Sequence, residues 1–297
     1  MVRAFRRWEL FDFFVVLALL IVAVVTLYPV ANVLSTSLSS PVEVSRGISW
    51  LPRDFDTTAY QYILKHPAIL RGYSNSVLYT VVGTSINLLL TSLCAYPLSK
   101  RKLVGRKVFM FIIVFTMFFS GGLIPMFLLV RSLGMFNTMW ALVVPTAIGT
   151  FNMIILRTFF QTVPIELEES AFLDGAGRWK VLFRIYLPLS KAAVATLALF
   201  YALGHWQGFF APLIYLKDPP KYPLPLVIRD IVLGDLLLSR LDDIEGVFDA
   251  EREAEYAAYS INFRFATLFV SMAPLLVMYP FVQKYFVKGV MIGSLKA

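Results

Sequence analysis

Residues 168–190 read EESAFLDGAGRWKVLFRIYLPLS, a charged segment set between two long apolar stretches. The positive N-terminal end of a helix favours the glutamates that open it, which are Glu166, Glu168 and Glu169. Glycines within 174–177 predict the end of this helix, because glycine readily adopts the left-handed conformation of a sharp turn. A second helix follows, and Pro188 predicts its end. The sequence therefore predicts a hairpin of two short helices in the 161–191 connection.

The second helix of this hairpin carries an apolar stripe at spacings i, i+3, i+4 and i+7, which are typical of one helical face. The stripe consists of Trp179, Leu182, Phe183 and Tyr186, and the other faces hold Arg178, Lys180 and Arg184. Two interpretations fit such a hairpin. It lies on anionic lipid at the membrane surface, or it docks into a basic cleft of another protein. Lipid explains the basic residues but not the three glutamates, so the sequence favours a protein partner.

The composition of the whole chain is that of an integral membrane protein. Of its 297 residues, 58% are hydrophobic and 15% are charged, against about 45–50% and about 25% in soluble domains. Six runs supply the about 20 mostly apolar residues that a helix needs to cross a bilayer. They are roughly 11–34, 73–98, 108–130, 139–160, 192–216 and 263–286. The predicted fold class is an all-α integral membrane protein with six transmembrane helices.

The distribution of lysine and arginine predicts the orientation of these helices. Basic residues gather at both chain ends and in the second and fourth connections, which share one side of the membrane if there are six spans. By the positive-inside rule this side is the cytoplasm, so both termini are expected there. The opposite side has the 217–262 connection, where ten acidic residues face five basic ones. This topology accounts for the net charge of +8, and a nucleic-acid partner is not expected.

Two segments are expected outside the cytoplasmic side. Residues 36–72 predict a short strand-like piece followed by a small helix. Residues 217–262 begin with a proline-rich turn or extended stretch and continue into acidic surface helices. Because they are the largest extracytoplasmic features, the 217–229 stretch and the acidic residues after it are predicted to contact a partner protein there.

The hairpin also resembles a known family. Glu169-Ser170-Ala171, three residues, Gly175, nine residues and Ile185-x-Leu187-Pro188 are similar to the coupling motif of permease subunits in ATP-binding-cassette importers. That pattern is Glu-Ala-Ala, three residues, Gly, nine residues, Ile-x-Leu-Pro, and only Ser170 departs from it. A nucleotide-binding loop at 175–177 is disfavoured, because no strand precedes it.

Further stretches extend this resemblance over nearly the whole chain. They are residues 75–102, 119–138 and 209–229 and the C-terminal FVQKYFVKGVMIGSLKA, all similar to carbohydrate-importer permeases related to the second maltose-importer permease. In its general residue pattern, the chain most resembles the subgroup that handles oligosaccharides of complex or acidic polysaccharides, including alginate. The resemblance implies a type I importer transmembrane domain in the bacterial plasma (inner) membrane.

The family also implies an assembly. Its members pair with a second, non-identical permease, two ATPase subunits and an extracytoplasmic sugar-binding protein, in contact with membrane lipid. The chain has no Walker-type Gly-x-x-x-x-Gly-Lys-Ser/Thr sequence, so ATP and Mg²⁺ are expected in partner subunits. No enzymatic activity, cofactor or metal is expected in this chain.

The resemblance assigns residues to roles. The ATPase-coupling residues are Glu169, Ala171, Asp174, Gly175, Ile185, Leu187 and Pro188. In the tail, Met291, Gly293 and Ser294 are expected at the ATPase interface. The predicted organisation is an N-terminal anchor helix with the first outer segment (1–72), a transmembrane core (73–286) and a cytoplasmic tail (287–297).

An ion-coupled secondary transporter is the competing class. Such proteins usually keep an ionisable residue at membrane depth, whereas the acidic Asp12 lies at the end of a predicted span and the other spans hold no acidic residue. Polar and aromatic groups at membrane depth suit a sugar pathway. The candidates are Trp206, Gln207, Asn75 and Asn87, and packing between helices explains them equally well.

Overall fold

The computed structural model describes residues 10–45, 47, 50–231, 261–274, 276 and 279. The described residues are mostly helical, and their only extended pairing is a single antiparallel bridge between Ser39 and Phe55. The chain divides into two compact units, one of residues 1–66 and 228–272 and the other of residues 67–227 and 273–297. The acidic part of the 217–262 connection and the tail lie outside the described residues.

The first unit begins with α1 (Leu10–Ser37), whose 28 residues are long and apolar enough to cross a membrane. Two short helices follow, α2 (Pro41–Ser45) and α3 (Thr58–Lys65). The hydroxyl groups of Ser37 and Tyr60 lie 2.6 Å apart and join the end of α1 to α3. The small helix predicted for 36–72 is therefore present, while the strand-like piece is reduced to the Ser39–Phe55 bridge.

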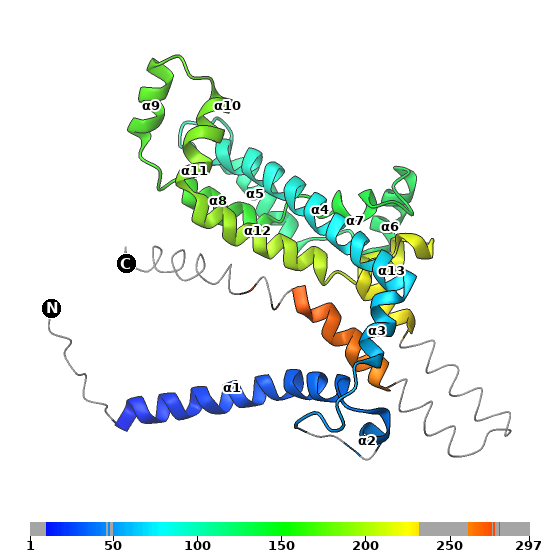
Figure 1. Ribbon diagram of the computed structural model, residues 1–297. Coiled ribbons are helices and arrows are strands. Elements are labelled where there is room, and N and C mark those ends of the chain that lie inside the picture. The colour runs from blue at the N-terminus through cyan, green and yellow to red at the C-terminus, as the bar shows by residue number, and fades with distance from the viewer. Residues whose placement is uncertain are drawn as a thin grey trace. The chain divides into compact units, whose positions relative to one another are not determined.

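The second unit is built around α4 (Pro67–Ser99). Proline suits the first helical turn because it lacks an N–H that would be unpaired there. The 33 residues of this helix make it about 50 Å long, and it too is long and apolar enough to span a bilayer. Helices α8 (Thr150–Phe160) and α12 (Lys191–Trp206) pack along it (Figure 1).

Three of the predicted spans are broken rather than continuous. The 108–130 span consists of α5 (Arg106–Phe118) and α6 (Leu123–Ser132), bent by 114° at a break containing Gly122, whose φ is +86°. The 139–160 span consists of α7 (Trp140–Val143) and α8, and the 192–216 span consists of α12 and α13 (Phe210–Tyr215). Glycine and proline in the intervening segments explain these breaks, because glycine adopts non-helical backbone conformations easily and proline lacks the N–H that a helix needs. A count of apolar residues does not detect such breaks.

Side chains of α4 and α12 satisfy the backbone of the break between α7 and α8. The Asn87 amide donates to the Thr146 and Ala147 carbonyls at 2.7 and 2.9 Å. The Tyr201 hydroxyl accepts from the Gly149 N–H at 3.0 Å and lies 2.7 Å from the Thr91 hydroxyl. Irregular backbone at membrane depth is tolerated where it is buried in protein or lines a water-filled cavity, and here protein side chains supply its hydrogen bonds. These two side chains therefore allow the span to break.

Candidate functional site

The predicted hairpin is present, and its first arm is α9 (Ile165–Leu173). The helix ends with Asp174 as its C-cap and Gly175 in the left-handed region at φ +75°. The Ala176 N–H donates to the Ala171 carbonyl at 2.9 Å, and the Gly175 N–H donates to the Phe172 carbonyl at 3.0 Å. This pair of bonds is a Schellman motif, which caps the helix and turns the chain sharply. The motif explains why a glycine stands at position 175.

The second arm combines α10 (Arg178–Val181), a π-helical turn (Leu182–Tyr186) and α11 (Leu187–Leu189). The prediction that Pro188 breaks the helix before the fifth span is confirmed, because the helix ends at Leu189 and the chain bends by 86° into α12. Proline has no N–H to donate to the preceding turn, and the π-helical turn ends two residues before Pro188. π-helical turns inside α-helices occur frequently at functional sites.

The apolar stripe of the second arm does not form one buried face. Leu182 and Tyr186 are buried, whereas Trp179 and Phe183 are 66% and 45% exposed. The two exposed rings stack on each other with centroids 6.2 Å apart. The stripe is therefore divided between the interior and the surface, and the hairpin presents an aromatic pair to its surroundings.

An apolar cluster lies between the hairpin and the transmembrane helices. Its buried members come from the end of α4, from α8, from the second arm and from α12, and include Tyr96, Phe160, Val181 and Leu197. Four hairpin residues pack against this cluster while remaining partly buried, namely Ala171, Ala176, Ile185 and Leu187. The apolar positions of the coupling motif thus attach the hairpin to the transmembrane helices.

A buried carboxylate joins the hairpin to α4. Glu168 is only 8% exposed. Its Oε2 accepts from the Tyr186 hydroxyl at 2.6 Å and from the Lys100 ammonium, and its Oε1 accepts from the Tyr96 hydroxyl at 3.3 Å. The Lys100 ammonium also lies over both tyrosine rings, 4.3 Å from the Tyr96 centroid and 3.8 Å from the Tyr186 centroid. We refer to these four residues as the Glu168 cluster.

The electrostatics of the Glu168 cluster favour the ionised carboxylate. Burial by itself would raise the pKa of the Glu168 carboxyl, but the hydrogen bonds from Lys100, Tyr186 and Tyr96 and the charge of Lys100 hold that pKa below its usual range. Burial lowers the pKa of the Lys100 ammonium, and the Glu168 carboxylate opposes this shift only in part. A buried charge is tolerated where it is paired and hydrogen-bonded, and both conditions are met here.

The remaining coupling residues lie at the hairpin surface. Glu169, Asp174 and Pro188 are exposed, as partner-contacting residues must be, and their contacts with a partner stay a prediction. Sequence reasoning assigned Glu168 only to the charge of the helix start and missed Lys100, Tyr96 and Tyr186. A signal for Glu168 exists, because it precedes Ala171 by three residues on one helical face, and Ala171 faces the apolar cluster.

Comparison with known proteins identifies the family. A family model described as "Binding-protein-dependent transport system inner membrane component" matches residues 87–292, more than half of the chain and all of the hairpin. The chain belongs to this family. The predicted family resemblance and the all-α fold class of a type I importer domain are thereby confirmed.

Two curated relatives of this transport component come from Bacillus subtilis (strain 168). Protein LplC is 40% identical over 293 residues, covering 98% of this chain and 96% of LplC. The polygalacturonan/rhamnogalacturonan transport system permease protein YtcP is 40% identical over 289 residues, covering 97% of this chain and 99% of YtcP. A solved bacterial ABC transporter involved in the import of the acidic polysaccharide alginate contains a chain that is 32% identical. It matches with a TM-score of 0.82 and covers 96% of this chain and 100% of that one.

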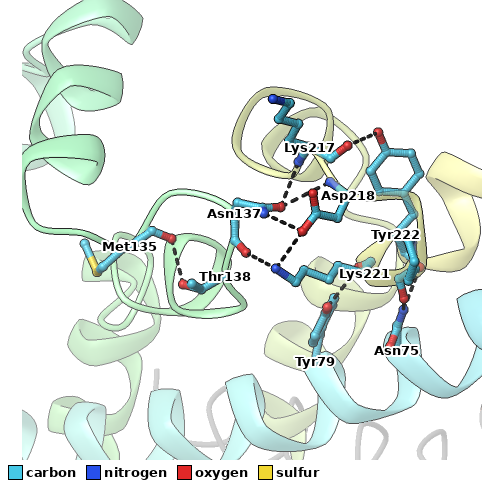
Figure 2. A network of polar contacts seen from close by, with 10 residues as sticks. Asn75, Tyr79, Met135, Asn137, Thr138, Lys217, Asp218, Lys221 and Tyr222 are labelled. Carbon is cyan, nitrogen blue, oxygen red and sulfur yellow. Dashed lines mark hydrogen bonds and ion pairs between the residues drawn. The ribbon is translucent and has the colours of Figure 1, made fainter.

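At the opposite end of α4, a polar network orders the first residues after α13 in this transport component (Figure 2). Asn137 has a positive φ of 60°, and its Oδ1 accepts from the Lys217 and Asp218 N–H groups at 3.0 and 3.2 Å. Its amide donates to the Asp218 carboxylate at 2.7 Å, and the Lys221 ammonium lies 2.9 Å from the same oxygen. The bond from Asn137 and the bond from Lys221 lower the pKa of the Asp218 carboxyl.

We expect Asn137→Ala to release this stretch locally. The variant removes the acceptor of two backbone N–H groups, so the amides of Lys217 and Asp218 should exchange with solvent faster. Hydrogen–deuterium exchange read by mass spectrometry measures this directly. Thr138→Ala is the matched control, because the Thr138 hydroxyl donates to the local Met135 carbonyl. Equal exchange at residues 217–218 in the two variants would contradict the prediction.

The four pathway candidates of this transport component lie at different levels of the second unit. Asn75 donates to the Pro220 and Tyr222 carbonyls at 2.9 and 3.0 Å, and Trp206 is buried in an edge contact with Tyr73. Gln207 is exposed just after α12. Asn87 is fully buried, and besides its two backbone bonds its oxygen lies 2.6 Å from Nε2 of His205. In this conformation both asparagine amides bind protein groups, and a role in sugar passage stays a prediction for all four.

The tail residues Met291, Gly293 and Ser294 lie outside the described residues.

Proposed function

We propose that this chain is a permease subunit of an ATP-driven importer and forms, with a second, non-identical permease, the membrane pathway for oligosaccharides derived from acidic polysaccharides. Two ATPase subunits hydrolyse ATP with Mg²⁺, and an extracytoplasmic sugar-binding protein delivers the substrate. The permease itself catalyses no reaction. It lies in the inner membrane with both termini in the cytoplasm, as the distribution of lysine and arginine indicates.

The hairpin is the observation that supports this proposal most directly. It presents exposed carboxylates at Glu169 and Asp174, and its second arm presents the stacked pair of Trp179 and Phe183. Aromatic residues that bury their faces against a partner often dominate the free energy of an interface. The same hairpin is attached to the transmembrane helices through the apolar cluster and the Glu168 cluster. A hairpin with one face free for a partner and the other face attached to the transmembrane helices is suited to transfer movement of the partner to those helices.

In the proposed mechanism, the free energy of ATP binding reaches the pathway through this hairpin. ATP closes the two ATPase subunits on each other, and the cleft that holds the hairpin moves with them. The hairpin then displaces the ends of α4 and α12, and the pathway changes from inward-facing to outward-facing. Such a transition is a rigid-body switch between two conformations, driven by a ligand that binds one of them better.

The names of the relatives support acidic oligosaccharides as substrates. Polygalacturonan and alginate are both polymers of uronic acids, and both occur in the names of proteins to which this chain is similar over 96% or more of its length. Uronic acids carry one carboxylate per residue, so their oligomers differ from neutral sugars in charge more than in size. The delivery of a negatively charged oligosaccharide is therefore the specific form of the proposal.

The test uses the whole importer, purified through a tag on this chain and reconstituted in liposomes with its binding protein. We expect ATP-dependent uptake of oligogalacturonate or oligoalginate, and stimulation of ATP hydrolysis by the loaded binding protein. A neutral oligosaccharide of the same length should give neither effect. Equal uptake of neutral and acidic oligosaccharides would refute the substrate class. Uptake driven by an ion gradient without ATP would refute the importer and favour a secondary transporter.

A further inference from the structure

The Glu168 carboxylate is the place where three separate segments of the second unit meet. Glu168 belongs to the first arm of the hairpin, Tyr186 to the second arm, and Tyr96 and Lys100 to the end of α4 and the residue that follows it. The carboxylate accepts a hydrogen bond from each of its three partners. One buried group thus binds the two arms of the hairpin to each other and both of them to α4.

The rest of the contact between hairpin and spans is different in kind. Ala171, Ile185 and Leu187 meet the apolar cluster through nonpolar side chains, and such contacts are non-directional, so they allow one surface to slide over the other. Hydrogen bonds weaken steeply when their geometry changes, and a charge left alone in a buried site is strongly unfavourable. The Glu168 cluster therefore fixes the orientation of the hairpin relative to the end of α4.

Helix α4 links the Glu168 cluster at one of its ends to segments that lie far from the hairpin. In its middle, Asn87 holds the carbonyl groups of the break between α7 and α8. At its other end, Asn75 holds the carbonyl groups of Pro220 and Tyr222, and the Ser76 hydroxyl accepts from the Leu224 N–H at 2.8 Å. A displacement of α4 at Tyr96 is consequently transmitted to the broken span and to the stretch after α13.

We propose that Glu168 is a positioning residue of transport, because its carboxylate makes α4 follow the movement of the coupling hairpin. This inference rests on the proposed function. Glu169, the neighbouring glutamate of the coupling motif, is exposed and available to a partner. The two adjacent glutamates thus have different tasks: Glu168 transmits motion within the chain, and Glu169 faces the ATPase subunit.

The experiment measures the number of sugar molecules transported per ATP hydrolysed by the reconstituted importer. Glu168→Gln keeps the shape of the side chain but removes the charge that three donors share, and we expect the ratio to fall about tenfold or more. Glu166→Gln is the matched control, since it removes the same charge from an exposed position on the same helix. Equal ratios in the two variants would overturn the proposal.

Tyr186→Phe is a milder variant in case Glu168→Gln prevents assembly. It removes the donor at 2.6 Å from Glu168, whereas Tyr96→Phe removes a donor at 3.3 Å. We expect the transport ratio to fall further in Tyr186→Phe than in Tyr96→Phe. A ratio equal to that of the unmodified importer in Tyr186→Phe would contradict the proposal.

A covalent link separates positioning from mere stability of the fold. The natural cysteine Cys94 is first replaced by alanine, and Glu168→Cys and Lys100→Cys are then introduced together. The pair should give a low ratio, and a short thiol-specific cross-linker should restore it, because the link again forces α4 to follow the hairpin. A complete cross-link that leaves the ratio low would overturn the proposal. If the unmodified importer shows no ATP-dependent transport, the proposed function fails instead.

Discussion

Gly175→Val is expected to uncouple ATP hydrolysis from transport while leaving the protein inserted in the membrane. The residue has φ +75°, and no atom lies within 4 Å of the position that a Cβ would take. An added Cβ therefore has open space around it, and the expected effect comes from the backbone conformation. The left-handed conformation costs an ordinary residue about 1–2 kcal/mol and a β-branched one more. Relief of this strain would open the Schellman turn and change the angle between the two arms.

The measurement for Gly175→Val is the ATP hydrolysis of the reconstituted importer with and without loaded binding protein. We expect stimulation and transport to fall about tenfold or more, since 1.4 kcal/mol corresponds to a factor of ten. Gly177→Val provides the matched control. Gly177 also has open space around its Cβ position, but its φ of −71° and ψ of 161° suit valine. Coupled transport at the normal rate in Gly175→Val would show that the elbow geometry does not matter.

Gly83→Leu should destabilise the fold itself, because it separates α4 from α12. A Cβ at position 83 would lie 2.5 to 2.8 Å from three atoms of the His205 ring. The ring cannot move freely, since its Nε2 lies 2.6 Å from the Asn87 oxygen. Displacing it would disturb the residue that holds the carbonyl groups of the broken span. Overpacking of this kind costs typically about 1–3 kcal/mol.

Gly204→Leu is the control for this second prediction. Gly204 lies on α12 one residue before His205, and no atom lies within 4 Å of its Cβ position. Leucine is also a better helix former than glycine, by up to about 1 kcal/mol. The thermal unfolding midpoint of the purified chain in detergent should fall clearly for Gly83→Leu and stay constant or rise for Gly204→Leu. Equal midpoints would mean that α4 and α12 are not in close contact at this point.

The sequence by itself determined the class of the protein and the position of its hairpin. These features depend on local signals, namely runs of apolar residues, a glycine at 175 and a proline at 188, and local signals act within a few residues of the chain. The elbow at Gly175 is the clearest case, because its left-handed backbone and both capping bonds involve only residues 171–176. Gly121 and Gly122 indicated either close helix contact or a bend in the 108–130 span, and the bend is present. The breaks in the other two spans were missed, since apolar composition is the same on both sides of a bend.

Only the tertiary structure decided which polar side chains hold the unit together. Asn75 meets the Pro220 carbonyl 145 residues away, and Asn87 meets the Thr146 carbonyl 59 residues away. The sequence shows an asparagine at membrane depth but not the carbonyl group that it will bind. Tertiary packing also decided which of the two adjacent glutamates, Glu168 or Glu169, is buried. Both carry the same charge, and the packing of α9 against the apolar cluster turned one of them toward Lys100, Tyr96 and Tyr186, while the other stayed in solvent.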